Sequence, residues 1–247
     1  MVAPRRKSGA LGRLRASQEI GLPQNQSEAK MLAIKSTLRR SAAIALFLVS
    51  AAATAQQLPE FTNFRSGDRV KYFLKNNIKS ESFEYQINEV DGSARKGTVV
   101  RGGRSTEFLT SKNGYLEKEF CFVQLHVCSW SPAIKLFDET MKVGDQWTGS
   151  SDIQTEDASV IEVLEHKVER FEKIKIKLGE FSTFKINASG SVKATMLKGG
   201  EVYKGSLKMT YWVGVVNKRL LILKWEYSND FRQKFYQELE SVQIADN

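Results

Sequence analysis

The chain has 247 residues, enough for one domain or two small ones, and carries 37 Lys and Arg against 28 Asp and Glu. Residues 1–56 contain nine of the basic and two of the acidic residues, so most of the net charge of +9 lies there. The remaining residues carry only +2, without the strongly basic surface typical of nucleic-acid-binding proteins. We therefore expect no nucleic-acid partner.

Residues 1–30 are polar and Arg-rich and show no apolar periodicity, which indicates a disordered extension or an over-extended start. Met31 is a second possible start, and the sequence leaves both open. Residues 31–55 have the three parts of a secretory signal peptide. Basic residues precede the apolar run 42–49, and small residues follow it.

Ala53 and Ala55 occupy the A-x-A positions of a cleavage site, which predicts a cut between Ala55 and Gln56. The apolar run is shorter than the roughly 20 residues that span a bilayer. We therefore expect no stable membrane span after cleavage and a periplasmic or secreted location.

From Gln56 onward the pattern favours β-structure, because apolar residues alternate with polar ones between Gly- and Asn-containing turns. Two segments, 160–176 and 231–244, also fit helical spacing, but alternation and the Val, Ile and Phe content of the first favour strands. The other expected strand regions are 68–75, 82–88, 99–110, 115–130, 180–189, 190–200, 201–214 and 215–230.

These regions predict an all-β protein with an extended, strongly curved antiparallel sheet, a half-open barrel or clam-like fold, after an N-terminal signal helix. After Ala55 the only prolines are Pro59 and Pro132, as expected for long paired strands. Residues 56–247 are expected to form a single exported β domain, with the alternative of two lobes meeting near 131–150.

The chain contains two cysteines, Cys121 and Cys128. An even number in an exported protein predicts a disulfide, with two free thiols as the alternative. The spacing is not that of a C-x-x-C redox motif.

The search for chemistry gives no catalytic, cofactor-binding or metal-binding candidate. The two histidines, His126 and His166, lack metal-ligand spacing, and no G-x-S-x-G nucleophile motif occurs. Carboxylates brought together across strands would allow glycan hydrolysis, and this alternative stays open.

Aromatic residues are the most informative functional signal. We take Trp147, Tyr211, Trp212 and Trp225 as candidates for the concave face of the sheet. Such residues form a packed core, a stacking surface, or the wall of a cavity for an apolar ligand, and alternation alone does not separate these uses.

The segments "KVERFEKIKIKLGEFSTFKI" (167–186), "LKMTYWVGVVNKRLLILKWEY" (207–227) and "QELESVQ" (237–243), preceded by "MKVGDQWTG" (141–149), resemble the DUF3108-like family of bacterial periplasmic proteins of unknown function. Lys177 and Leu178 stand where that family has Pro and Ala. The resemblance implies a long curved antiparallel sheet in the cell envelope, and it implies no catalytic residues.

Together these observations predict a non-enzymatic envelope protein that binds an apolar or envelope-derived ligand, or a protein partner, on a curved sheet. The alternatives are an envelope hydrolase acting on glycans and a purely structural interaction domain.

Overall fold

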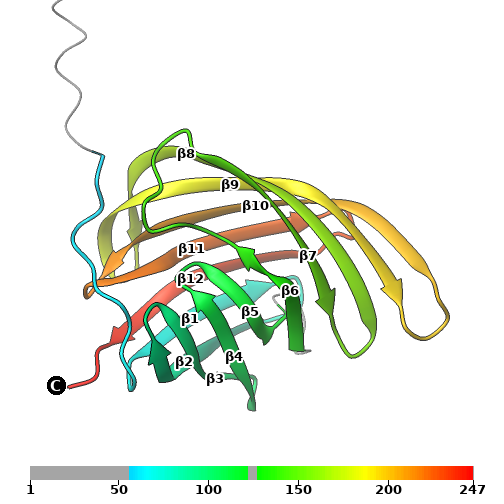
Figure 1. Cartoon of the computed structure of the whole chain (residues 1–247), viewed down its shortest axis with the longest axis horizontal. Helices are drawn as coiled ribbons and strands as arrows, with labels where there is room; N and C mark the ends of the chain where they lie inside the picture. The colour runs from blue at the N-terminus through cyan, green and yellow to red at the C-terminus, as the bar shows by residue number, and fades with distance from the viewer. Residues whose placement is uncertain (1–55, 122–126, 247) are drawn as a thin grey trace, which may run out of the picture. The chain divides into compact units, whose positions relative to one another are not determined.

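The computed structural model describes residues 56–121 and 127–246, which form strands joined by turns (Figure 1). The strands are β1 Arg69–Asn76, β2 Ser80–Asp91, β3 Ala94–Arg101, β4 Arg104–Lys112, β5 Tyr115–Phe120, β6 Val127–Lys135, β7 Gln146–Gln154, β8 Ala158–Ile176, β9 Gly179–Met196, β10 Val202–Val216, β11 Arg219–Asn229 and β12 Lys234–Gln243.

Each strand pairs antiparallel with the next along the chain, and β1 pairs with β12, so the described strands form a closed barrel. The closing register runs from Arg69 opposite Gln243 to Asn76 opposite Phe235. The predicted curved antiparallel sheet is confirmed, and it closes completely where a half-open form was also expected. The predicted signal helix lies outside the described residues, which include no helix long and apolar enough to cross a membrane.

The two segments with ambiguous periodicity are both strands. Residues 160–176 belong to β8, which pairs with β9 over nearly its whole length, and 231–244 contains β12. In β8, Leu164, His166 and Val168 are buried while Glu165 and Lys167 are exposed. This period of two places one row of side chains inside the barrel and the other outside.

The core of the barrel is apolar and aromatic along its length. Buried side chains with less than 2% exposure include Val99, Ile186, Tyr211, Leu223 and Leu239. Because consecutive strands run in opposite directions, the turns that join them alternate between the two ends of the barrel. We call the end with the β2–β3, β4–β5, β8–β9 and β10–β11 turns the terminal end, since the segment before β1 and the one after β12 also lie there (Figure 1). The opposite one is the far end.

Gly190 of β9 lies where strands β8 and β9 approach each other closely. A Cβ atom at this position would lie 1.8 Å from the carbonyl oxygen of Val163 and 3.0 Å from the Cα of Leu164. Because both atoms belong to the backbone, no side chain can move aside to accommodate a methyl group.

We therefore expect Gly190→Ala to lower the free energy of unfolding by about 1–3 kcal/mol or more, as overpacking does. Urea denaturation measures this, with Gly149→Ala as the control, because a Cβ there meets nothing within 4 Å. Equal stability of the two variants would show that the strands separate more easily than the structure indicates.

Candidate functional site

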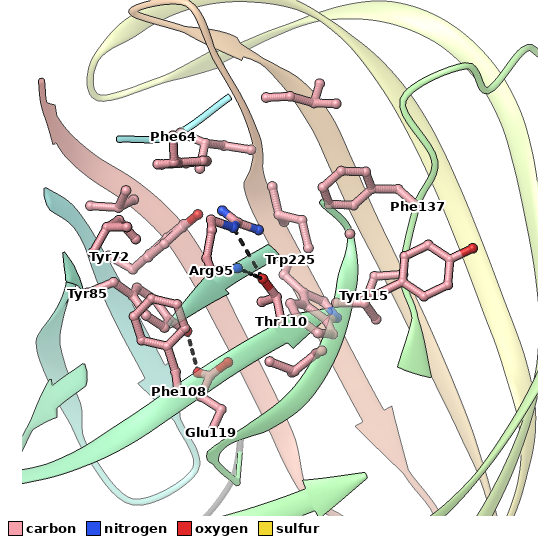
Figure 2. Close-up of a pocket in the computed structure, with 18 of the residues that line it drawn as sticks. Phe64, Tyr72, Tyr85, Arg95, Phe108, Thr110, Tyr115, Glu119, Phe137 and Trp225 are labelled. Carbon is pink, nitrogen blue, oxygen red and sulfur yellow. Dashed lines mark hydrogen bonds between the residues drawn. The ribbon is translucent and has the colours of Figure 1, made fainter. Parts of the chain in front are cut away.

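The barrel interior holds a cavity of about 110 Å³ near the terminal end (Figure 2). The lining residues come from the segment before β1, from strands β1–β5, β11 and β12, and from the β6–β7 connection. The half-exposed residues Arg95, Thr110 and Tyr115 are part of the lining, so the cavity reaches solvent.

Aromatic rings form much of the wall. The ring of Tyr72 on β1 stacks on Phe83 with centroids 5.6 Å apart, and Tyr85 on β2 meets Phe108 on β4 edge to face at 5.1 Å. Phe137 and Trp225 complete the wall on other elements (Figure 2). Such contacts fix the rings, and their apolar faces favour an apolar ligand body.

Arg95 brings a positive charge to this aromatic wall. It lies on β3 on the same face as Gly97 and Val99, whose partners across the sheet face the interior. Its guanidinium lies over the Phe64 ring at 4.4 Å, and its Nε donates to the Thr110 hydroxyl at 3.4 Å. Burial lowers the pKa of Arg95 to about 10, so the group stays charged at neutral pH.

No carboxylate of the described residues lies within ion-pair distance of the Arg95 guanidinium. Glu139 contributes only from farther away, where it raises the pKa of Arg95 slightly against the effect of burial. Even a partly buried cation in an apolar wall is costly unless it is paired, and here cation–π contact and one hydroxyl are the partners of Arg95. The arrangement is suited to accept an anionic group from outside.

Glu119 on β5 is the carboxylate in the cavity lining, and it is buried. The Tyr85 hydroxyl donates a short hydrogen bond to it. Burial raises the pKa of Glu119 to about 7, against opposing effects of Tyr85 and Arg101. Glycan hydrolysis by two carboxylates needs a second acid across the cavity, and the described lining contains Glu119 alone.

The segment before β1 covers the terminal end of the barrel. Its Thr62 amide donates to the Lys218 carbonyl at 2.8 Å, and its Asn63 side chain donates to the Gly92 carbonyl at 3.1 Å. Phe64 of the same segment is buried and lines the cavity. The segment therefore ties the β10–β11 turn to the β2–β3 turn and forms part of the cavity wall.

A second polar cluster lies deeper in the interior. The ring of His166 stacks on Trp147 with centroids 4.9 Å apart, and its Nδ1 lies 2.9 Å from the Tyr211 hydroxyl. Tyr211 donates to the Leu136 carbonyl, so Nδ1 of His166 is the donor to the Tyr211 hydroxyl. Burial lowers the pKa of His166 to about 4, which is consistent with a packed, uncharged imidazole.

The four candidate aromatics do not share one face. Trp225 lines the cavity, while Tyr211 and Trp147 pack against His166 in the interior. Trp212 lies on the opposite face of β10, between the ammonium groups of Lys185 and Lys224. Its indole N–H donates to Glu172 at 2.8 Å. Placing Trp212 with the concave-face residues is thus corrected, because neighbouring residues of a strand point to opposite faces.

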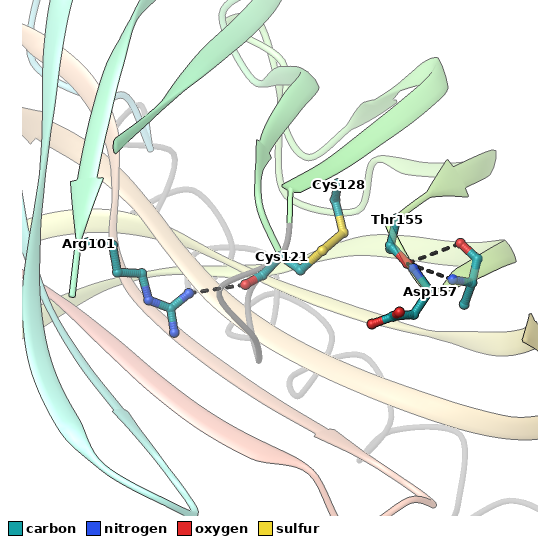
Figure 3. The surroundings of a disulfide bond; sticks show 6 residues. Arg101, Cys121, Cys128, Thr155 and Asp157 are labelled. Atoms are coloured by element: carbon teal, nitrogen blue, oxygen red, sulfur yellow. Dashed lines mark hydrogen bonds between the residues drawn. A yellow bond between two sulfur atoms is a disulfide. The ribbon is translucent and has the colours of Figure 1, made fainter. Parts of the chain in front are cut away.

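Cys121 and Cys128 are joined by a disulfide between β5 and β6 at the far end (Figure 3). Arg101, which is buried, donates from Nη1 to the Cys121 carbonyl at 3.0 Å and from Nε to Glu81 at 2.9 Å. The bridge thus closes a short segment and is anchored to β3. His126 lies in that segment and is outside the described residues. Ala53 and Ala55 of the predicted cleavage site, far away in the sequence, are also outside them. Gln56 is the first described residue.

Sequence reasoning missed Arg95 and Glu119 as site residues. A signal existed for Arg95, because it falls on the apolar phase of its strand two residues before Gly97. None existed for Glu119, since the pairing of β5 with both neighbours is irregular and breaks the alternation. No group of three or more potential metal ligands occurs among the described residues.

Comparison with known proteins gives fold likeness only. No family model matches, and no curated protein matches. A solved structure from Bacteroides fragilis, named as an exported protein with a YmcC-like fold, is 12% identical, covers 74% of this chain and 99% of its own, and has a TM-score of 0.47.

Two lipoproteins by name are also similar. The one from Parabacteroides distasonis is 13% identical, covers 76% of this chain and 100% of its own, and has a TM-score of 0.45. The hypothetical lipoprotein YmcC from Escherichia coli is 11% identical, covers 89% and 99%, and has a TM-score of 0.40. At such low sequence identities and TM-scores, no inference about ligand or activity follows. Membership in the DUF3108-like family stays a prediction.

Proposed function

We propose that this protein binds a small molecule with an apolar body and an acidic group in the barrel cavity, with the acidic group on Arg95. The observation that carries the proposal is the charged guanidinium in an aromatic-lined cavity, with no carboxylate of the described residues paired to it. A carboxylate accepts two parallel hydrogen bonds from a guanidinium, and an anion entering here would neutralise a charge that the fold leaves unpaired.

The cavity volume limits the ligand. About 110 Å³ corresponds to roughly three or four waters at ~30 Å³ each, so most of the interior is filled by the protein's own side chains. The site has room for a small carboxylic acid, or for the acidic end of a longer molecule whose remainder leaves through the opening. This narrows the expected apolar ligand to one with an anionic end.

The place of action is also part of the proposal. The predicted signal peptide at 31–55 and the disulfide favour an oxidising, extracytoplasmic compartment, periplasmic or secreted. The resemblance to the DUF3108-like family agrees with an envelope location.

Calorimetric titration with benzoate and benzyl alcohol tests the proposal, because the two probes share a ring and differ in charge. We expect benzoate to bind the wild-type protein, and Arg95→Met to weaken it about ten-fold or more, as expected for the loss of a charge-assisted hydrogen bond. The matched control is Arg104→Met, which removes an exposed arginine at the far end. Benzyl alcohol should bind more weakly and respond little to either change.

Equal affinity of the Arg95→Met and Arg104→Met variants for benzoate would contradict the proposal. Tighter binding of benzyl alcohol than of benzoate would also contradict it, since the site would then be apolar only.

A further inference from the structure

Three turns at the far end of the barrel form one continuous surface, which we call the far-end rim: residues 77–79, 196–204 and 229–234. The Asn77 side chain donates to the Arg232 carbonyl at 2.6 Å, which joins the β1–β2 turn to the β11–β12 turn. The Phe231 ring lies 6.5 Å from Tyr203, and the Asp230 amide donates to the Ser206 carbonyl. These contacts join the β9–β10 hairpin to the other two turns.

The rim exposes large apolar side chains at its turn tips. Ile78 is 87% exposed and Leu197 is 60% exposed, and Val202, Tyr203 and Phe231 are also exposed. Single exposed apolar residues are ordinary on a protein surface, but here five gather on three adjoining turns. Tips with this composition are suited to insertion into an apolar layer, and aromatic rings favour its interface with water.

Basic side chains surround these apolar tips. The rim contains Lys79, Lys198, Lys204, Arg232 and Lys234, against the acids Glu201 and Asp230. The acidic β7–β8 turn, Glu156–Asp157, adjoins the rim at Leu197, whose amide donates to the Asp157 carbonyl at 2.8 Å. Lys79 pairs with Glu81 at 2.8 Å, whereas no described carboxylate lies within ion-pair distance of the other four.

The positive charge continues from the rim onto the outer surface. A groove of about 940 Å³ crosses β10, β11, β12 and β1, and exposed Lys75, Lys208 and Lys234 lie along it with Glu226 and Tyr236. The exported part as a whole carries only +2, so this concentration of basic side chains is local. Apolar tips with a basic flank match the layered chemistry of a membrane with acidic headgroups above hydrocarbon.

We propose that the far-end rim docks on the surface of an anionic lipid bilayer, with Ile78, Leu197 and Phe231 inserted and the surrounding lysines at the headgroups. This role is separate from the cavity, which lies near the terminal end. The apolar tips favour a bilayer over a soluble anionic polymer, because a polymer would need the charges but not the tips.

Sedimentation with vesicles of phosphatidylcholine containing about one-quarter phosphatidylglycerol tests the proposal. We expect the wild-type chain to bind these vesicles more tightly than pure phosphatidylcholine, and binding to fall about five-fold for each rim cation removed, as in Lys198→Gln. Ile78→Ser with Leu197→Ser should weaken binding about ten-fold or more, because both tips lose buried apolar area.

The controls lie on the exposed β8–β9 hairpin at the terminal end: Lys175→Gln for the change at Lys198, and Leu178→Ser for the apolar-to-Ser changes. Both should bind as the wild type does. All variants carry the same residues 1–55, so any binding by those residues contributes equally. Phe231→Trp gives a local readout, since brominated lipid should quench its fluorescence but not that of Leu178→Trp.

Equal vesicle binding by the Ile78→Ser, Leu197→Ser variant and by Leu178→Ser, with no quenching of Phe231→Trp, would overturn the proposal. A second result would also overturn it: the wild-type chain binds dextran sulfate tightly but not vesicles, and the Ile78→Ser, Leu197→Ser variant binds dextran sulfate equally well. The basic groove would then be assigned to an anionic polymer.

Discussion

Asp68→Ala is expected to lower the free energy of unfolding by about 3–5 kcal/mol, the largest effect that the structure predicts for a single polar side chain. Asp68 is 0% exposed and accepts a hydrogen bond from the Nε of Arg219 at 2.7 Å, and Arg219 is itself only 3% exposed. Removing the carboxylate leaves Arg219 as a buried cation without its acid.

The same carboxylate also holds three parts of the chain together. It accepts from the Arg65 amide and from the Ala245 amide, both at 2.9 Å, while the Asp68 carbonyl accepts from the Ile87 amide. Burial alone would raise the pKa of Asp68, but Arg219 and these backbone amides hold it below its ordinary value. Removing the Asp68 carboxylate therefore weakens two parts of the structure: the segment before β1 that covers the cavity, and the place where β1 and β12 close the barrel.

Urea denaturation at neutral pH measures the change, with Asp91→Ala as the control because Asp91 is exposed on a turn at the same end. Asp68→Leu combined with Arg219→Met should recover part of the loss, since no charge then stays buried. A loss below about 1 kcal/mol for Asp68→Ala would show that solvent reaches Arg219.

Glu162→Gln is expected to stabilise the protein, and the gain should grow as pH rises above 4.5 and reach its full size above about pH 7. Glu162 lies on β8 opposite Val192 of β9 and Ser151 of β7, and its side chain is buried. Burial raises the pKa of Glu162 from 4.5 to about 7. The folded protein therefore holds this proton over a pH range in which the unfolded chain has released it.

Below about pH 4.5 the carboxyl is protonated in both the folded and the unfolded chain. The stability contributed by the protonated carboxyl of the folded state is then fully present, with no cost for a buried charge. As pH rises through 4.5 to about 7, that contribution is lost. A shift of this size corresponds to about 3 kcal/mol.

The measurement is the difference in unfolding free energy between Glu162→Gln and the wild type from about pH 4 to about pH 8. Two other groups also make the stability pH-dependent, and taking the difference cancels their contributions. The raised pKa of Glu119 lowers stability as pH rises, as that of Glu162 does. The lowered pKa of His166 has the opposite effect, because stability is lost as pH falls from 6.5 to about 4. Glu165→Gln, on the exposed face of the same strand, is the control. Parallel curves for Glu162→Gln and the wild type would show that Glu162 is hydrated.

The fold was largely predictable because strand alternation is a local property. The alternation in 160–176 identified β8 although its apolar residues also fit a helix, and the even number of cysteines in an exported chain indicated the pairing of Cys121 and Cys128. Closure was not predictable, because the pairing of Arg69 with Gln243 joins residues from opposite ends of the exported part and depends on the accumulated curvature of all the strands.

The candidate site was predictable only in its aromatic character. Tyr211 faces the interior of the barrel, so its neighbour Trp212 faces the opposite side of β10 and the two cannot share one face. That no carboxylate of the described residues pairs with Arg95 is a property of three-dimensional packing among β3, β4 and the segment before β1. No sequence pattern reports it.

Binding of a ligand's acidic group by Arg95 in the barrel cavity can be followed through the Nε–H signals of the arginine side chains. These signals are recorded by nuclear magnetic resonance during titration with benzoate and assigned with Arg95→Met and Arg104→Met. We expect a saturable shift of the Arg95 signal and no shift of the Arg104 signal. An unchanged Arg95 signal at benzoate concentrations that saturate binding, or equal shifts for both arginines, would contradict it.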